Sequence, residues 1–421
     1  MPETSAPSNG FSFVHRRARY DAAIYWNQTF IYLAYFSFLP IFTVWFTTQE
    51  HFSDTVAGTL FTLYIVVGST TRTLLAPVLN GLPASLVLFC SSILAAGGVL
   101  LFMLRGNLAA SVAGVVIAGT GLYINSLAAK VAISEKADTR SGQSFKGFSL
   151  LYVVMNIGAV AGPVVGVALF RRSGNELILF LALAYVVAAV LSGLVTSTSR
   201  NDIRHGEVGN SEFGRFRSYL AGLLHPLRSR RLLELLVLNF GVWFAYIQLF
   251  TVLPIVLERR HQFVDSGVLF SLSAILAIVF QLLMTGFFSA RLNKHMDVTV
   301  LVAITCLVAA FAIAFLITAF VYLVFVVLIF TFGEALIMPC LDELTSRIAP
   351  RSMRSSYFGL VGVSKALGQG LGGLVGVAAL STLPISDLGK AWAVGLVSST
   401  LVLVFFIFRR GDITKKEIDH A

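Results

Sequence analysis

Two charged side chains in the middle of long apolar runs are the first candidates for chemistry in this sequence. Glu334 lies about 13 residues into the run 320–347, roughly 20 Å along a helix and near its middle. Lys365 lies about ten residues into the run 355–382, roughly 15 Å along. Ionisable groups in such surroundings are costly and by default mark proton or substrate pathways. We therefore predict that Glu334 binds a proton or contacts a substrate, with a structural pairing to Lys365 as the alternative.

The same two residues suggest a switch. Because their runs follow one another in the sequence, Glu334 and Lys365 are expected to lie close together and to form an ion pair. Protonation of Glu334 would then release Lys365. A third charge, Arg72, lies in the run 54–79 about seven residues from its end. It either reaches the lipid headgroups by snorkelling or binds an anionic group in the interior.

The composition indicates what kind of protein positions these charges. The chain has 421 residues, of which 57% are hydrophobic and 12% charged, whereas a soluble domain has about 25% charged residues. Too few polar side chains remain to cover a water-facing surface, so the surface must face lipid. A helix needs roughly 20 apolar residues to cross the hydrocarbon core, and we predict an all-α integral membrane protein with about twelve such helices. The expected spans are 22–48, 54–79, 84–104, 108–134, 145–170, 176–197, 232–257, 265–290, 297–318, 320–347, 355–382 and 387–409.

Lysine and arginine residues predict the orientation of these spans. If both chain ends are cytoplasmic, 23 of the 31 basic residues fall in cytoplasmic segments and six in outer segments, as the positive-inside rule requires. The net charge of +10 therefore lies in short loops and does not indicate a nucleic-acid partner. We expect a multi-pass membrane protein, with membrane lipids around it, both termini in the cytoplasm and the first helix retained.

The longest polar segment divides the spans into six and six. Residues 198–231 are rich in Arg, Ser, Gly and Asn and are predicted to form a cytoplasmic linker. Residues 213–224 within it form either a helix on the membrane surface or part of a solvated tether. The predicted organisation is a cytoplasmic tail 1–21, a six-helix half 22–197, the linker 198–231, a second six-helix half 232–409 and a cytoplasmic tail 410–421.

Glycines and a proline in the run 145–170 form the most specific pattern. Residues 158–167 read Gly-Ala-Val-Ala-Gly-Pro-Val-Val-Gly-Val. This resembles the Gly-xxx-Gly-Pro-xx-Gly-Gly motif of the drug/proton antiporter branch of the major facilitator superfamily, with Val167 in place of the last glycine. Glycines four apart let another helix approach closely, so either a gating hinge or ordinary helix packing is expected. The hinge candidates are Gly158, Gly162, Pro163 and Gly166, with Gly368 and Gly372 at the corresponding place in the second half.

Two loops extend the resemblance, and a third departs from it. Residues 286–295 resemble the superfamily's Gly-x-Leu-Ala-Asp-Arg-x-Gly-Arg-Arg loop, in which Gly286, Arg291 and Lys294 match and Ala290 replaces the aspartate. The equivalent loop of the first half, 76–85, lacks every charge of the motif. Because this loop helps to latch the cytoplasmic side shut in the family, we expect a different or weak latch there. Residues 349–359 resemble a turn of bacterial multidrug-type members, and the resemblance implies a location in a bacterial inner membrane.

The resemblance covers nearly the whole chain and implies two pseudo-symmetric six-helix halves around a central cavity. In the family, spans one, four, seven and ten line that cavity. Here these spans carry aromatic and amide side chains, which suit an amphipathic organic molecule; for each, anchoring a helix at the membrane interface is the alternative. The cavity-lining candidates are Tyr25, Asn27, Gln28, Tyr32, Tyr123, Asn125, Asn239, Trp243, Tyr246 and Gln248.

The implied function is secondary active transport of a small amphipathic organic molecule by alternating access, with proton-coupled efflux favoured by the glycine–proline motif. Arg72 is the one charge deep in the first half, which favours neutral, zwitterionic or anionic substrates. Proton-coupled import of a metabolite, a peptide-like compound or a metal-chelating natural product is the main alternative, followed by uncoupled diffusion and a non-transporting receptor. The sequence shows no nucleophile–base pair, metal-ligand cluster or phosphate loop, so we expect no enzyme activity, metal or cofactor. The expected partners are the substrate and protons, and the chain is expected to be a monomer.

Overall fold

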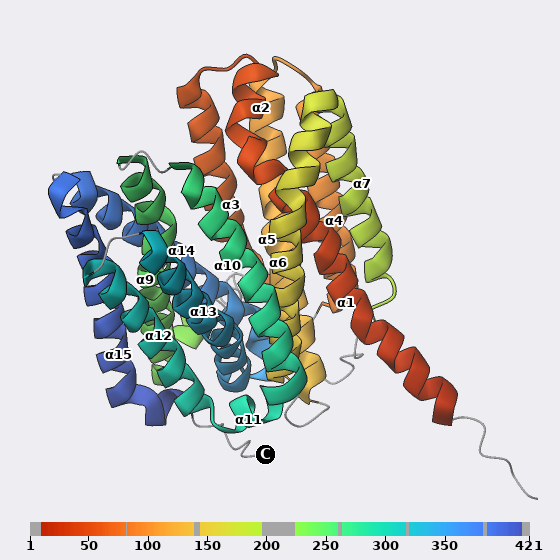
Figure 1. The fold of residues 1–421 in the computed structure, drawn as a ribbon. Helices are drawn as coiled ribbons and strands as arrows, with labels where there is room; N and C mark the ends of the chain where they lie inside the picture. The colour runs from red at the N-terminus through yellow and green to blue at the C-terminus, as the bar shows by residue number, and fades with distance from the viewer. Residues whose placement is uncertain are drawn as a thin grey trace, which may run out of the picture. The chain divides into compact units, whose positions relative to one another are not determined.

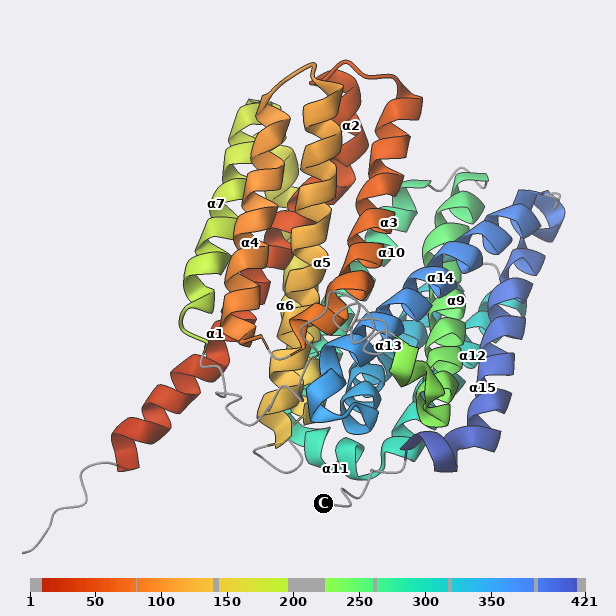
Figure 2. The same ribbon diagram turned by 180° about the vertical axis from the view of Figure 1, so that it is seen from behind.

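Helices account for every regular element in the residues that the structure describes. The computed structural model describes residues 10–80, 82–138, 144–195, 224–259, 263–316, 320–381 and 385–414. In these ranges eleven helices are long and apolar enough to cross a membrane, and Figures 1 and 2 show them as long ribbons. This confirms the predicted all-α membrane fold. Most of the linker, 198–223, the chain ends 1–9 and 415–421, and the expected boundary at 318–319 lie outside the described residues.

The first half of the chain contains the helices that correspond to the first six expected spans. Proline interrupts only the first of them: the helix stops before Pro40, passes through one tight turn and resumes, because proline lacks an amide hydrogen and collides with the preceding turn. The elements are α1 (Gly10–Phe38), η1 (Leu39–Ile41), α2 (Phe42–Thr48), α3 (Asp54–Leu79), α4 (Ala84–Leu100), η2 (Leu101–Met103), α5 (Leu108–Asp138), α6 (Ser144–Arg172) and α7 (Gly174–Ser192).

The second half of the chain contains the other six. Its eighth expected span does not end as a plain helix, because α10 passes into a single π-helical turn and then into a short helix. The elements are η3 (His225–Arg228), α9 (Arg230–Arg259), α10 (Phe263–Leu283), η4 (Met284–Phe288), α11 (Ser289–Lys294), α12 (Met296–Leu316), α13 (Phe320–Ile348), η5 (Arg351–Met353), α14 (Arg354–Ser381), η6 (Ile385–Trp392) and α15 (Ala393–Thr414).

The chain forms two compact units whose boundaries fall inside helices. Unit 1 comprises Met1–Gly68, Leu82–Ala132 and Ala161–Arg200, and unit 2 comprises Ser69–Gly81, Ile133–Val160 and Asn201–Ala421. The later part of α3, the end of α5 and the start of α6 therefore belong to unit 2. We call these helix ends, which the predicted orientation places toward the cytoplasm, the inner ends. The division into halves at the linker remains a prediction about the repeat.

Each unit has its own apolar core. In unit 1, α7 packs against α1 and α4, as Figure 2 shows for α4 and α7, and a cluster of buried aromatic side chains fills the region around Phe42, Trp45 and Phe102. In unit 2, α14 and α15 pack along α9, and α12 packs along α13. The second core places α9, α13 and α14 next to one another, and these are the helices that carry Tyr246, Glu334 and Lys365.

Candidate functional site

Glu334 lies in the helix that runs through the core of unit 2. Its neighbour Gly333 is buried where a side chain would meet the Ala303 carbonyl oxygen, so α12 packs closely at this level. Oε1 of the half-buried Glu334 accepts a hydrogen bond of 2.9 Å from the Tyr246 hydroxyl of α9. The carboxyl group thus has a hydrogen-bonding partner on a second helix and remains partly accessible.

Lys365 contacts the same stretch of α9. Its Nζ lies 3.6 Å from the centroid of the Trp243 ring, a cation–π contact of a kind worth about 0.5–2 kcal/mol. The rings of Trp243 and Tyr246 meet edge to face, with centroids 4.8 Å apart. Lys365 therefore rests on one ring while Glu334 accepts a hydrogen bond from the hydroxyl of the other. Two adjacent aromatic side chains of α9 thus contact the two charged residues, and the ion pair between Glu334 and Lys365 stays a prediction.

Further aromatic side chains extend this surface. The Tyr246 ring lies 4.8 Å from Phe250 and 5.5 Å from Phe330, between ring centroids. Phe250 stacks on Phe270 at 5.4 Å. Phe330 precedes Glu334 by one turn of α13, so the acid lies at one end of an aromatic surface and the lysine nearby. Such a surface can bind an apolar ring together with a polar or charged group.

The two other polar candidates of α9 bind α14. Nδ2 of Asn239 donates to the Val361 carbonyl at 2.9 Å and to Ser364 Oγ at 3.2 Å. Nε2 of Gln248 donates to the Gly372 carbonyl at 2.7 Å. Both side chains are buried, so in this structure they hold α14, the helix of Lys365, against α9.

The amide candidates of unit 1 form a separate buried network. Gln28 Nε2 donates to Asn27 Oδ1 at 2.8 Å and to Asn125 Oδ1 at 2.6 Å. Asn125 Nδ2 donates to Ser92 Oγ at 2.9 Å, and Asn27 Nδ2 to the Ala188 carbonyl at 2.7 Å. All three amides are fully buried. They join α1, α4, α5 and α7 through hydrogen bonds. The residue types show that these side chains need polar partners, but their spacing in the sequence does not show which partners they find.

The tyrosine candidates of unit 1 are half-buried. Tyr25 and Tyr32 lie on α1, and the Tyr32 hydroxyl is 3.4 Å from Ser126 Oγ of α5. Tyr123 of α5 lies against Gly68, where any side chain on α3 would collide with its ring. These tyrosines therefore lie among α1, α3 and α5, and their part in substrate binding stays a prediction.

Arg72 reaches another helix of unit 2. Its guanidinium lies against the backbone of α14 at Gly362, where a Cβ atom would collide with it. Lys365 follows Gly362 by three residues on α14, so the guanidinium of Arg72, which comes from α3, contacts α14 one turn from Lys365. The binding of an anionic group by Arg72 stays a prediction.

The inner end of α3 holds the first turn of α14. Asn80 Oδ1 accepts a hydrogen bond of 3.0 Å from the Ser355 amide, and its Nδ2 donates to Ser356 Oγ at 2.8 Å. Thr73 lies two turns before Asn80 on α3, and its Oγ1 donates to the carbonyl of Gly359, one turn after Ser355 on α14, at 3.2 Å. Asn80 thus satisfies an amide at a helix start that has no partner within its own helix. The contact that Asn80, in the charge-free loop 76–85, makes with α14 is therefore one between uncharged groups.

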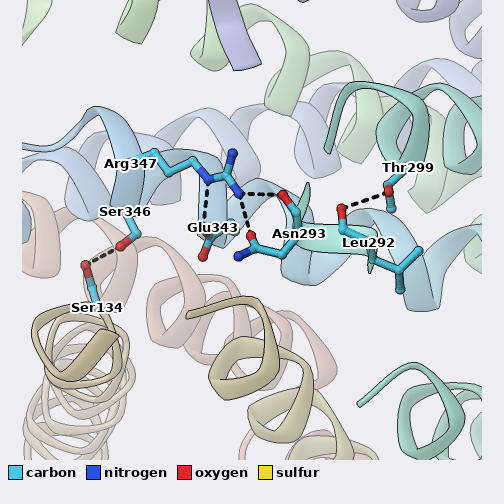
Figure 3. A network of polar contacts seen from close by, with 7 residues as sticks. All are labelled: Ser134, Leu292, Asn293, Thr299, Glu343, Ser346 and Arg347. Atoms are coloured by element: carbon cyan, nitrogen blue, oxygen red, sulfur yellow. Dashed lines mark hydrogen bonds and ion pairs between the residues drawn. The ribbon is translucent and has the colours of Figure 1, made fainter. Parts of the chain in front are cut away.

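Inner-end helices of unit 2 make further polar contacts. Tyr152 of α6 donates to Asp342 Oδ2 of α13 at 2.9 Å, and Ser134 of α5 is hydrogen-bonded to Ser346 (Figure 3). Near the end of α10, just before the π-helical turn, Gln281 Oε1 accepts a hydrogen bond of 2.6 Å from Ser149 Oγ of α6. The sequence gives no local signal for these residues, because each partner lies more than a hundred positions away.

The loop that resembles the family motif lies in η4 and α11. Gly286 falls in the π-helical turn, and Arg291 and Lys294 are exposed on α11. Arg347 Nε binds Glu343 Oε1, four residues earlier on α13, at 2.8 Å, and its Nη2 donates to the Asn293 carbonyl at 3.0 Å (Figure 3). The loop is thereby attached to the end of α13.

The glycine patterns of the two halves make equivalent contacts. A side chain at Gly162 or Gly166 of α6 would collide with the backbone of α1 near Ser37. A side chain at Gly368 or Gly372 of α14 would collide with carbonyl oxygens of α9. Both sets therefore let one helix pack closely on the first long helix of its own half. Gly158 is buried in α6, and Pro163 lies inside α6 without ending it.

Among the residues that the structure describes, no group of three His, Cys, Asp or Glu side chains is arranged to hold a metal ion. The candidate site in unit 2 brings together the Glu334 carboxyl group, the Lys365 ammonium group and aromatic rings. The guanidinium of Arg72, from α3, contacts α14 at Gly362, three residues before Lys365.

Comparison with known proteins gives the same architecture. The chain is similar to the crystal structure of the human organic anion transporter MFSD10 (TETRAN), at 19% identity and a TM-score of 0.75, over 95% of this chain and 99% of that one. It is also similar to a bacterial homologue of the iron transporter ferroportin in an outward-facing state, at 15% identity and a TM-score of 0.71, over 93% and 99%. A search of curated protein sequences found no match. The sequence profile of the Major Facilitator Superfamily matches residues 24–373. The chain belongs to the Major Facilitator Superfamily of membrane transporters.

Proposed function

We propose that this chain is a proton-coupled secondary transporter that exports a small amphipathic organic molecule. The observation that supports this best is the pair formed by Glu334, bound to Tyr246, and Lys365, resting on Trp243. It combines a group that exchanges protons, a cation and an aromatic surface within one bundle of helices. Intramembrane ionisable groups of this kind are the usual sites of coupling.

In the proposed cycle, the substrate and the proton compete for Glu334. The aromatic surface around Tyr246, Phe250 and Phe330 holds the apolar part of the substrate. The charged carboxylate accepts hydrogen bonds from a polar or cationic group of the substrate, and Lys365 binds its anionic group. A proton on Glu334 removes the negative charge and weakens this contact, so that the substrate leaves. An amphipathic zwitterion fits this exchange best.

Proton-coupled uptake of an organic anion is the second candidate. If protonation of Glu334 releases Lys365 to bind an anion, proton and anion are bound together, as cotransport requires. Lys365 and Arg72 both favour an anionic group, and the human protein of similar structure is an organic anion transporter. The direction of movement under a pH gradient separates this candidate from export.

The test begins with a ligand screen on purified protein, read as thermal stabilisation by drugs and microbial metabolites. A stabilising compound is then followed in proteoliposomes under an imposed pH gradient. We expect wild type to move the compound in the direction opposite to the flow of protons. Glu334→Gln should bind the compound, but its transport should not respond to the pH gradient. Glu176→Gln, which changes an exposed carboxylate at the start of α7, is the matched control. An unchanged response in Glu334→Gln would refute the proposal. Movement of the compound by wild type in the same direction as the protons would favour uptake.

A further inference from the structure

Two arginines on different helices share one carboxylate at the inner end of unit 2. Arg230, at the start of α9, lies 3.0 Å from Glu234 Oε1, and Arg409, near the end of α15, lies 3.4 Å from the same atom. The arginine side chains are 71% and 40% exposed, whereas that of Glu234 is 8% exposed. The carboxylate is thus enclosed, and both guanidinium groups face outward.

Apolar side chains continue from each arginine toward the middle of the membrane. Leu233 and Val237 follow Arg230 by three and seven residues, so they lie on its face of α9. Phe405 and Leu401 precede Arg409 by four and eight residues on α15. The two helices pack side by side, and Val402 fills the space above Gly241. Three of the four apolar side chains are exposed: Leu233, Val237 and Leu401, at 44%, 53% and 64%.

The charge around this pair of helix ends is positive. Arg228, Arg231 and Arg410 lie within two residues of Arg230 or Arg409, and Asp412 is 3.7 Å from Arg409. Five arginines against Glu234 and Asp412 leave a formal charge of +3. A guanidinium has five N–H donors, so each arginine that binds Glu234 can also bind a phosphate group.

We propose that the seam between the start of α9 and the end of α15 binds an anionic phospholipid of the cytoplasmic leaflet. Its phosphate binds Arg230 and Arg409, and its acyl chains lie along Leu233, Val237 and Leu401. Only a molecule with an anionic head and apolar tails matches both the exposed guanidinium groups and the exposed apolar side chains below them. The predicted orientation places this seam at the cytoplasmic surface, where anionic lipids attract basic residues. The inference does not depend on the transported substrate.

The test uses the full chain in nanodiscs that contain phosphatidylglycerol and phosphatidylcholine in equal amounts. Native mass spectrometry counts the lipids that stay bound after release into detergent. We expect wild type to retain phosphatidylglycerol in preference to phosphatidylcholine. Arg230→Gln should lower this retention by roughly fivefold, and it leaves Glu234 bound to Arg409, so folding is preserved. The double variant with Arg409→Gln should lose the preference.

The matched control removes two charges from another cytoplasmic surface. Arg291→Gln with Lys294→Gln changes exposed residues of α11, and it should keep the lipid preference of wild type. An equal loss in this control would show that only diffuse surface charge attracts the lipid and would overturn the proposal. Equal retention of both lipids by wild type would do the same, as would complete displacement of the lipid by inorganic phosphate, which has no tails.

Discussion

Arg72 lies where it does because residue 362 has no side chain. The guanidinium occupies the space that a Cβ atom would fill, and this brings an intramembrane cation onto the helix that carries Lys365. A flexible arginine can move aside at little cost, so a methyl group at this position is expected to shift the charge and leave the fold intact. The position of a single charge can therefore be changed without removing it.

We predict that Gly362→Ala reduces the affinity of the transporter for a substrate that carries an anionic group, in the same direction as Arg72→Gln. The measurement is the KM for transport of such a substrate in proteoliposomes, together with the thermal unfolding midpoint. Gly370→Ala is the control, since residue 370 of the same helix faces open space. Wild-type transport by Gly362→Ala would show that the position of Arg72 has no role in binding.

The charged residues of the site were predictable and their partners were not. Glu334 and Lys365 stand out in the sequence because charges are rare in apolar runs. Their connection through Tyr246 and Trp243 depends on which face of α9 points toward α13 and α14, and an apolar run around a helix does not show this. The contacts of Asn80 were harder still to predict, because an uncharged residue in place of a charged motif suggests only that the usual ionic contacts of that loop are missing.

Among the elements, the helices follow directly from the length of the apolar runs, whereas only one of the two interruptions discussed here follows from local chemistry. Pro40 divides the first span as proline requires. The π-helical turn at Met284–Phe288 has no such signal, and the sequence predicts an unbroken helix there. The hydrogen-bonding partners of a helix end can come from another element. At the start of α14, the partner of the Ser355 amide comes from α3.

Removal of the Asn80 side chain should destabilise the attachment of α14. We predict that Asn80→Ala lowers the free energy of unfolding by about 1 kcal/mol, the usual cost of a lost helix cap. Asn80→Asp keeps the oxygen that accepts from the Ser355 amide and adds a negative charge, which is favourable at a helix start. Thermal unfolding of the purified variants compares them. If Asn80→Asp is as unstable as Asn80→Ala, the bond to Ser356 matters more than the cap.

At the scale of the whole molecule, the sequence predicts the number and order of the spans, and the match to the superfamily over residues 24–373 agrees with it. The composition of the compact units was not predictable. The inner ends of α3, α5 and α6 belong to unit 2 through contacts such as Thr73 with Gly359, which are 286 positions apart. No local pattern connects residues at such a distance.

The orientation of the whole chain is open to a direct test. In a variant without Cys90, Cys306 and Cys340, we predict that the cysteine introduced by Lys294→Cys reacts with a membrane-impermeant thiol reagent only after the cells are permeabilised. A single cysteine at Arg171 should react in intact cells. The distribution of lysine and arginine is the physical reason. The reverse pattern would invert the orientation, and with it the leaflet assigned to the phospholipid site.

The contact between Lys365 and Trp243 has a consequence for spectroscopy. Indole emission depends on nearby charge, and here an ammonium group lies 3.6 Å from the ring centroid. The chain has four tryptophans, and a variant that retains only Trp243 would therefore emit light whose intensity and wavelength change when the lysine moves away. Such a variant carries its own optical reporter, and rapid-mixing fluorescence could follow the charge pair through a transport cycle without any attached dye.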